Sequence, residues 1–166
     1  MKKLATLFLL LALCMGMNCK ALDITVVDKV EPTDEMFMDM AVTAAKKSVA
    51  SGGVPSGAVI ILNGAWRSTG TPEGDKTAEE TAIAKSRLSK LTNASVYTIN
   101  EPTTAIVNLL NSLGVTAIYF ANPRDAVVAA GVYPASAYDD SAIGTLQNAA
   151  PMYRLPFSDA EAMLKK

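Results

Sequence analysis

The chain has 166 residues, of which 50% are hydrophobic and 19% charged, and its formal net charge is −1. It contains no histidine and only two cysteines, Cys14 and Cys19. This balance of charge argues against a nucleic-acid partner, because backbone binding depends on clustered Lys and Arg. The missing histidine excludes Ser-His and Cys-His nucleophile pairs and leaves few of the usual zinc ligands.

The first residues have the pattern of an export signal. Two lysines precede an apolar run over residues 4–13, which is too short to span a bilayer. Small residues at the −3 and −1 positions predict cleavage after Ala21, so residues 1–21 are expected to be a signal peptide and the protein periplasmic or secreted. A lipoprotein acylated at Cys14 is the alternative, although Leu13 is a poor fit before such a site.

Residues 22–35 are interpreted as an N-terminal linker or edge segment. A helix is expected over residues 33–51, with Thr33 or Asp34 as its cap, and Gly52 ends it. Its apolar face is predicted from spacings of three and four, and consists of Met36, Met40, Thr43 or Ala44, and Lys47. The methionines are interpreted as core filler rather than as sulfur ligands.

Two short strands and a second helix follow. Residues 58–63 and 65–69 are expected to form a hairpin around Asn63-Gly64, the strongest turn signal in the chain. A helix is predicted over residues 76–91, with Glu79 and Glu80 facing outward or toward its first turn. Its inward face is predicted to comprise Thr77, Thr81, Ala84, Leu88 and Leu91.

The second half of the chain continues the alternation of strands and helices. Strands are predicted over residues 94–99 and 115–121, and an edge strand over 152–155. Helices are expected from Pro102 to Leu113, from Asn122 or Pro123 to Ala130, and over 158–166. This order predicts a three-layer α/β/α sandwich around a mixed sheet of about five strands, formed by residues 36–166.

Five segments in order carry a family resemblance. They are Pro55-Ser56-Gly57-Ala58, Asp75-Lys76-Thr77-Ala78, Tyr97-Thr98-Ile99-Asn100-Glu101-Pro102, Asp125-Ala126 and Gly131-Val132-Tyr133. Together they resemble the cytidine and deoxycytidylate deaminase superfamily, and most closely its guanine deaminase and tRNA adenosine deaminase branch. The resemblance implies a cytidine deaminase-like fold and descent from a zinc-dependent aminohydrolase.

That family binds zinc through one His and two Cys, and a nearby Glu moves protons while zinc-bound hydroxide attacks the substrate. Carried over from the resemblance, the histidine position is Glu79 and the glutamate position is Thr81. The two cysteine positions are Thr103 and Ile106. All four residue types differ from the family, so the sequence predicts no catalytic residues, no metal site and no zinc.

The four positions have a packing interpretation as well. Ile106 continues an apolar stripe with Leu110 and Leu113, and Thr81 shares a helix face with Ala84. A weak hydrated calcium or magnesium ion at Asp75, Glu79 and Glu80 is the alternative. The family's pocket residues also differ, since Ser56 stands where an aromatic residue is usual and Pro72 where an asparagine is usual.

A few residues remain as candidates for ligand contact, namely Ser56, Glu79, Glu101 and Tyr138. Glu79, Glu80 and Glu101 could form an acidic cleft with acid–base chemistry, or could stabilise helix N-termini. Trp66, the only tryptophan, is either an edge-strand core residue or an exposed contact.

Two classes of function follow. The first is an exported deaminase-fold pseudoenzyme that acts as a binding or interaction module for a protein partner or a small molecule, with a homodimer as a further expectation. The second is a residual or metal-independent nucleobase or nucleoside aminohydrolase. The loss of the zinc-ligand residue types favours the first.

Overall fold

The computed structural model describes residues 24–143 and 149–165, and the predicted signal peptide with Cys14 and Cys19 lies outside them. The described chain forms a six-stranded sheet in the order β1-β6-β5-β4-β2-β3. The strands are β1 (Ile24–Val26), β2 (Ala58–Leu62), β3 (Ala65–Gly70), β4 (Ala94–Asn100), β5 (Ala117–Asn122) and β6 (Met152–Arg154). The helices are α2 (Pro32–Ala50), α3 (Ala78–Ser86), α4 (Thr104–Leu113), α5 (Arg124–Ala129) and α6 (Ser158–Ala162), with short 3₁₀ turns η1 (Ala135–Ala137) and η2 (Asp140–Ala142).

The sheet is mixed, as predicted. β2 pairs antiparallel with β3 and β4, whereas β4, β5, β6 and β1 are parallel to one another. The prediction that the Met152 strand lies at an edge is wrong, because β1 pairs with it and takes the edge position itself. That extra strand, from the expected linker or edge segment, raises the sheet to six strands.

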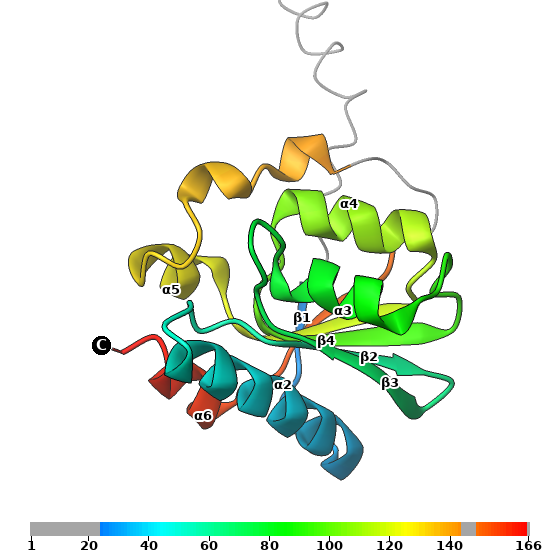
Figure 1. Cartoon of the computed structure of the whole chain (residues 1–166), viewed down its shortest axis with the longest axis horizontal. Coiled ribbons are helices and arrows are strands. Elements are labelled where there is room, and N and C mark those ends of the chain that lie inside the picture. Colours follow the sequence, from blue (N-terminus) through cyan, green and yellow to red (C-terminus); the bar gives the residue numbers. More distant parts are fainter. Residues whose placement is uncertain (1–23, 144–148, 166) are drawn as a thin grey trace, which may run out of the picture.

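Helices cover both faces of the sheet, α3 and α4 on one and α2 and α6 on the other (Figure 1). Alternate residues of β4 supply the two cores. Val96 packs toward α3 and α4, whereas Tyr97 and Ile99 pack toward α2 and α6. The α/β/α sandwich predicted from the alternation of elements is therefore confirmed.

The buried face of α2 matches the predicted one only at Ala44, which is buried, and at Met40, which packs partly buried against the core. Met38, Ala41, Val42 and Ala45 are buried, whereas Met36 is 51% exposed. The small alanines face the sheet because the backbone comes very close there. A Cβ added to Gly57 would lie 2.3 Å from the carbonyl oxygen of Ala41, so the backbone of Gly57 packs directly against the helix at this point. The helix also begins one residue earlier than predicted, with Glu31 at the N-cap and Pro32 in the first turn.

α3 is shorter than predicted and presents a different face. It ends at Ser86 because Arg87 adopts a left-handed conformation, with φ of 57°, so Leu88 and Leu91 lie beyond it. Glu79 is buried and Ala84 is exposed, contrary to the predicted faces. A helix of nine residues needs only a narrow buried stripe, and the tight approach of β3 at Gly70 sets which residues form it.

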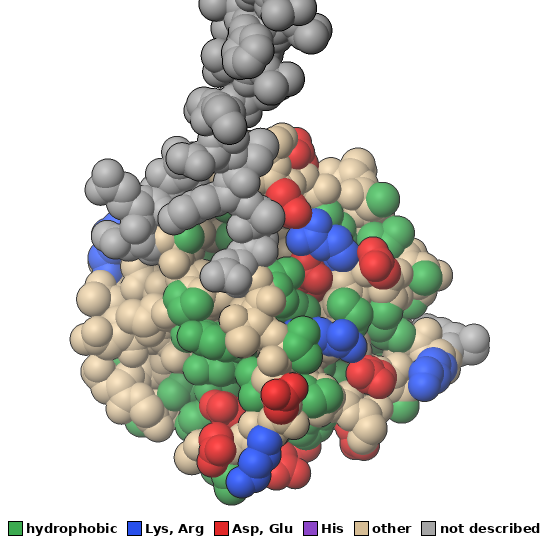
Figure 2. Space-filling view, turned by 180° about the vertical axis from the view of Figure 1, so that it is seen from behind, with side chains coloured by type: hydrophobic (Ala, Val, Ile, Leu, Met, Phe, Trp, Pro, Cys, Tyr) green, Lys and Arg blue, Asp and Glu red, His purple; other side chains and the backbone are tan. Residues whose placement is uncertain are grey.

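The remaining helices begin or end within a few residues of the predicted positions. Thr103, rather than Pro102, precedes the first residue of α4, and α6 begins after Phe157 without a side-chain cap. Within residues 24–143 and 149–165, no helix combines the length and apolarity needed to cross a membrane. Figure 2 shows acidic and basic side chains interspersed with hydrophobic ones on the face opposite to that of Figure 1.

Candidate functional site

The four positions carried over from the deaminase motif lie on α3 and α4, which cover the same face of the sheet (Figure 1). Glu79 and Thr81 are in α3, Thr103 is the N-cap of α4, and Ile106 is in its first turn. All four are buried: the most exposed, Thr103, is 9% exposed. These positions therefore belong to the interior of the molecule.

Glu79 is a buried carboxyl that accepts a hydrogen bond from the central sheet. The hydroxyl of Thr98, on β4, donates a hydrogen bond to Oε1 of Glu79 at 2.6 Å. Burial raises the pKa of Glu79 above its ordinary value of 4.5, and the hydrogen bond from Thr98 offsets part of that rise. Among the described residues, Oε2 of Glu79 and the hydroxyl of Thr81 have no hydrogen-bond partner. These two atoms thus lie at the positions that resemble the family's zinc-ligating histidine and its proton-shuttling glutamate.

Glu80 has a structural role at the start of α3. The Thr77 hydroxyl accepts a hydrogen bond from the Glu80 N–H at 3.3 Å, and the Glu80 carboxylate accepts one from the Thr77 N–H at 2.8 Å. This reciprocal capping box satisfies two N–H groups that a helix start otherwise leaves unpaired. The Glu80 carboxylate is therefore engaged at the N-terminus of α3, whereas that of Glu79 accepts a hydrogen bond from Thr98.

The predicted calcium or magnesium alternative is not formed by these residues. Asp75 is exposed, Glu80 is engaged at the helix cap, and Glu79 is buried. In the part of the chain that the structure describes, no three His, Cys, Asp or Glu residues are grouped closely enough to hold a metal ion. The expected acidic cleft of Glu79, Glu80 and Glu101 is likewise not assembled, because each carboxylate has a different structural partner.

Ile106 and Thr103 belong to the packing of α4. Ile106 is 4% exposed and lies in the core cluster with Val107 and Leu110, as the apolar stripe predicts. Thr103 caps the helix only through its backbone: its carbonyl accepts the N–H of Val107 at 2.9 Å, and its side chain makes no capping hydrogen bond.

Glu101 stabilises a different helix from the one expected. Its carboxylate accepts a hydrogen bond from the backbone N–H of Arg124 at 2.9 Å and another from Nε of Arg124 at 2.7 Å. Arg124 is the first residue of α5, so the negative charge satisfies the N-terminus of α5 rather than that of α4. Glu101 is 3% exposed.

Two tyrosines fasten the segment after α5 over this region. Tyr138 donates a hydrogen bond from its hydroxyl to the carbonyl oxygen of Glu101 at 2.9 Å, and the guanidinium of Arg124 lies 5.4 Å from the centre of its ring. The Tyr133 hydroxyl lies 3.3 Å from Oγ of Ser56, which is fully buried two residues before β2 begins. Each of the four predicted ligand-contact residues therefore has a partner within the molecule. Ser56 contacts Tyr133 and Glu79 accepts a hydrogen bond from Thr98. Glu101 contacts both Arg124 and Tyr138.

Sequence reasoning missed Thr98 and Arg124. Thr98 could have been found from alternation along β4, because it lies on the same face as Ala94 and Val96, toward α3. Nothing in the local sequence marks Arg124 as the partner of Glu101, since 22 residues separate the two and only the parallel pairing of β4 and β5 brings them together.

Comparison with protein-family models gives no match, and comparison with curated proteins gives none either. Solved structures do match. A guanine deaminase from Nitrosomonas europaea superposes with a TM-score of 0.67 and 18% identity, covering 82% of this chain and 84% of that chain. A dCMP deaminase from the cyanophage S-TIM5 gives a TM-score of 0.52 and 17% identity, covering 75% and 99%.

A third neighbour comes from studies of A-to-I editing by transfer RNA deaminases at the wobble position, with a TM-score of 0.58 and 20% identity, covering 78% of this chain and 99% of that chain. At these low sequence identities, the structural likeness concerns only the arrangement of helices and strands. The chain therefore has the cytidine deaminase-like fold that these guanine, transfer RNA and dCMP deaminases share.

Proposed function

We propose that this chain is an exported protein with the deaminase fold and without a zinc centre, and that it acts as a binding module rather than as a deaminase. The observation that carries the proposal is the environment of Glu79, which is buried and hydrogen-bonded. At the position that resembles the zinc-ligating histidine, a buried carboxyl with a raised pKa is bonded to Thr98.

The chemistry of the four positions supports this proposal. A zinc site needs at least three strong protein ligands, usually thiolate, imidazole or carboxylate. Ile106 has no donor atom and Thr103 offers a neutral hydroxyl. Burial raises the pKa of Glu79 and so disfavours the carboxylate form that would bind zinc. Thr81, at the position that resembles the proton-shuttling glutamate, has a hydroxyl that does not ionise near neutral pH and so cannot replace a carboxylate as the acid–base group. These residues do not fit zinc.

The proposal is tested on the purified protein by measuring bound metal by mass spectrometry and ammonia release from guanine, cytosine, adenosine and cytidine. We expect no zinc above the level of a metal-free control protein and no ammonia release. Stoichiometric zinc, or turnover that a chelator abolishes, would contradict it.

A metal-independent aminohydrolase is the second candidate, and the same carboxyl is the observation in its favour. A carboxyl with a raised pKa can act as a general acid, and Oε2 of Glu79 has no hydrogen-bond partner within the described residues. Its 2% exposure counts against contact with a substrate. Ammonia release that persists after metal removal and is lost in Glu79→Gln would establish this candidate in place of the first.

Export belongs to the proposal and has its own test. The pattern of the first residues predicts removal of residues 1–21. The intact mass of the protein recovered outside the cytoplasm should therefore correspond to a chain that begins at Leu22. A lipid-modified chain that begins at Cys14 would establish the lipoprotein alternative instead.

A further inference from the structure

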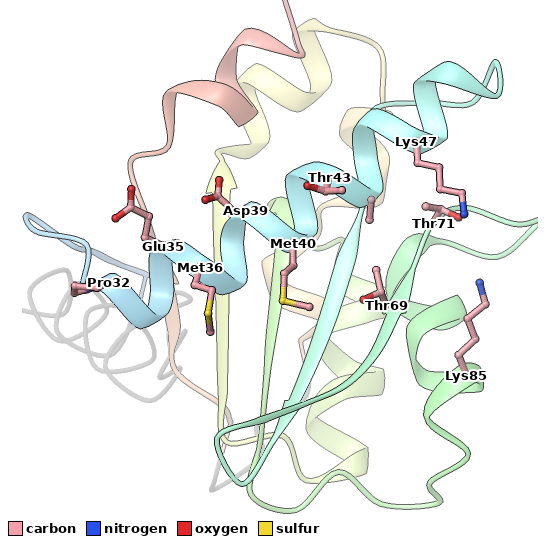
Figure 3. A pocket seen from close by; sticks show the side chains of 11 residues that line it. Pro32, Glu35, Met36, Asp39, Met40, Thr43, Lys47, Thr69, Thr71 and Lys85 are labelled. Atoms are coloured by element: carbon pink, nitrogen blue, oxygen red, sulfur yellow. The ribbon is translucent and has the colours of Figure 1, made fainter.

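An open groove of about 720 Å³ runs beside α2, between that helix, β3 and α3. Figure 3 shows Met36 and Met40 pointing from α2 into this groove, with Thr69 on the opposite wall. Its charged side chains are spread along the helix, with Asp39 toward the N-terminal end and Lys47 near the C-terminal end (Figure 3). Small-molecule sites usually combine an apolar surface with a few polar groups that converge. The groove beside α2 has the apolar surface, but its charges do not converge.

A second open groove, which we call the α5–α6 groove, lies at the carboxyl ends of two parallel strands. Its volume is about 450 Å³, and its lining includes Asn122, the last residue of β5, and Arg154, the last residue of β6. This volume lies within the range of about 300–1,000 Å³ that is usual for small-molecule sites. The groove shares no lining residue with the four deaminase-motif positions on α3 and α4.

The chain leaves these two neighbouring strands toward opposite faces of the sheet. After β5, α5 leads to η2, whose first N–H groups include that of Asp139, which donates a hydrogen bond to the Thr104 hydroxyl of α4 at 2.7 Å. After β6, α6 packs on the other face with α2 (Figure 1). In open α/β sheets, ligands bind in the crevice outside the carboxyl ends of strands where the connections diverge in this way. The topology therefore makes the α5–α6 groove a candidate binding site.

Arg154 is a cation with long internal contacts. Its Nε lies 3.4 Å from the carbonyl oxygen of Ala121, and its Nη2 lies 3.6 Å from Oε1 of Glu161. Hydrogen bonds between a guanidinium and a carboxylate are usually about 2.7–2.9 Å long. The pair of Arg124 with Glu101, at 2.7 Å, has that length. Since a guanidinium carries five N–H donors, Arg154 retains donors for an external carboxylate.

The groove contains a second cation and two acceptors. Lys165 lines it and forms no ion pair within residues 24–143 and 149–165. Glu161 adds a carboxylate beside Arg154. The Asn122 amide donates hydrogen bonds to Oδ1 of Asn100 and to the carbonyl oxygen of Ala160, both at 3.1 Å, and its own Oδ1 has no partner among the described residues. Two cations thus favour a negative group on a ligand, whereas Glu161 and Asn122 favour a positive group.

The remaining walls of the groove are apolar. They consist of Pro123, Ala126, Ala129 and Ala130 from the α5 segment and Leu164 from the chain after α6. The short alanine side chains leave space for a small aliphatic group, and no aromatic residue lines the groove.

We propose that the α5–α6 groove binds a small zwitterion with an apolar body, namely an aliphatic α-amino acid. Its carboxylate binds Arg154 and Lys165, its ammonium group faces Glu161, and its side chain contacts the alanines of the α5 segment. The two charges of an α-amino acid are adjacent, as are those of Arg154 and Glu161, so the ligand replaces one long ion pair by two contacts. This site is separate from the deaminase-motif positions, so the proposal stands whether or not the chain binds zinc.

The ligand class is tested by isothermal titration calorimetry of the dialysed protein with leucine, isocaproate and isoamylamine. Isocaproate is leucine without its amino group, and isoamylamine is leucine without its carboxylate. We expect leucine to bind, and each analogue to bind about tenfold more weakly or worse, because each lacks one charged contact. Absence of leucine binding at millimolar concentration, or equal affinity for leucine and either analogue, would overturn the proposal.

The location of the site is tested with variants of the groove. Arg154→Met should weaken leucine binding about tenfold or more, whereas Arg87→Met, the same change at an exposed residue outside the groove, should leave it unchanged. Ala129→Trp should abolish binding by filling the groove from an exposed position, and Ala84→Trp on α3 is its matched control. Circular dichroism establishes that each variant is folded. Leucine binding that is unchanged in both Arg154→Met and Ala129→Trp would overturn the assignment to this groove.

Discussion

Thr98 on β4 donates a hydrogen bond of 2.6 Å to the buried carboxyl of Glu79 on α3. This contact joins the central sheet to the helix that, in the resembling family, presents the histidine ligand of zinc. It satisfies one carboxyl oxygen and leaves the other without a partner among the described residues. Burial raises the pKa of Glu79, because removal from water disfavours the charged carboxylate.

The first prediction concerns pH. Since the folded pKa of Glu79 is raised, its contribution to stability is fully present below the ordinary value of 4.5 and is lost as pH rises through the folded pKa. Relative to wild type, Glu79→Gln should therefore gain free energy of unfolding as pH rises above 4.5, by up to about 1.4 kcal/mol per pH unit within that window. Urea unfolding at a series of pH values measures the difference. Glu35→Gln, at an exposed carboxylate, is the control, and parallel profiles for Glu79→Gln and wild type would contradict the assignment.

The second prediction removes the donor to that carboxyl. Thr98→Val keeps the side-chain shape and leaves both oxygens of a buried carboxyl unpaired, so it should cost about 1–3 kcal/mol of unfolding free energy. Thr116→Val is the comparison, because the Thr116 hydroxyl also donates one hydrogen bond, to the carbonyl oxygen of Ala94, but the residue is exposed. Chemical denaturation of both variants provides the test. An equal, small effect at the two sites would show that the Glu79 contact does not stabilise the fold.

The third prediction concerns Glu101. Its carboxylate holds both the backbone and the side chain of Arg124, and its side chain is only 4% exposed. Glu101→Ala should therefore cost about 3 kcal/mol, the scale expected when one partner of a buried ion pair is removed. Asp159→Ala breaks the pair with Lys46, whose two side chains are 58% and 59% exposed, and should cost less than about 1 kcal/mol. Thermal and urea unfolding compare the two, and an Asp159→Ala loss as large as that of Glu101→Ala would contradict the ranking.

The fourth prediction restores the donor atoms of the family motif. A variant that combines Glu79→His, Thr81→Glu, Thr103→Cys and Ile106→Cys should bind zinc stoichiometrically if α3 and α4 keep the relative placement of the fold. Zinc competition with a colorimetric chelator measures the affinity. The matched control omits Ile106→Cys and should bind at least tenfold more weakly, because it has lost one of three ligands. Equal zinc binding by the two variants would show that the positions no longer converge.

The layer order and most strands could be predicted from local patterns. The hairpin at Asn63-Gly64 was predictable because its turn depends on two adjacent residues. Strand β5 was predictable because a buried strand is a continuous apolar run in the sequence. The order of sheet strands was less accessible. β6 was predicted to be an edge strand because its three residues do not indicate a strand on either side. In the structure it lies between β1 and β5, so a pairing between the two ends of the described chain places it inside the sheet.

The faces of the helices were the weakest part of the prediction. In α2 the large methionines suggested the core face, but the close approach of Gly57 selects the alanines, and Met36 is left in the open groove. In α3 a charged residue was expected outside, yet Glu79 is buried against Thr98. Both errors have the same physical cause, which is that the space between a helix and a sheet depends on backbone positions far apart in the sequence.

The sequence by itself determined the fold class and the absence of histidine, and both follow from residue types and their order. Only the tertiary structure decided that Glu79 is buried with one oxygen lacking a partner among the described residues, and that Glu101 stabilises the N-terminus of α5. It also decided that an open groove runs beside α2. Each of these depends on which surfaces remain in contact with water after the layers pack, and that is decided by contacts between segments that no local pattern contains.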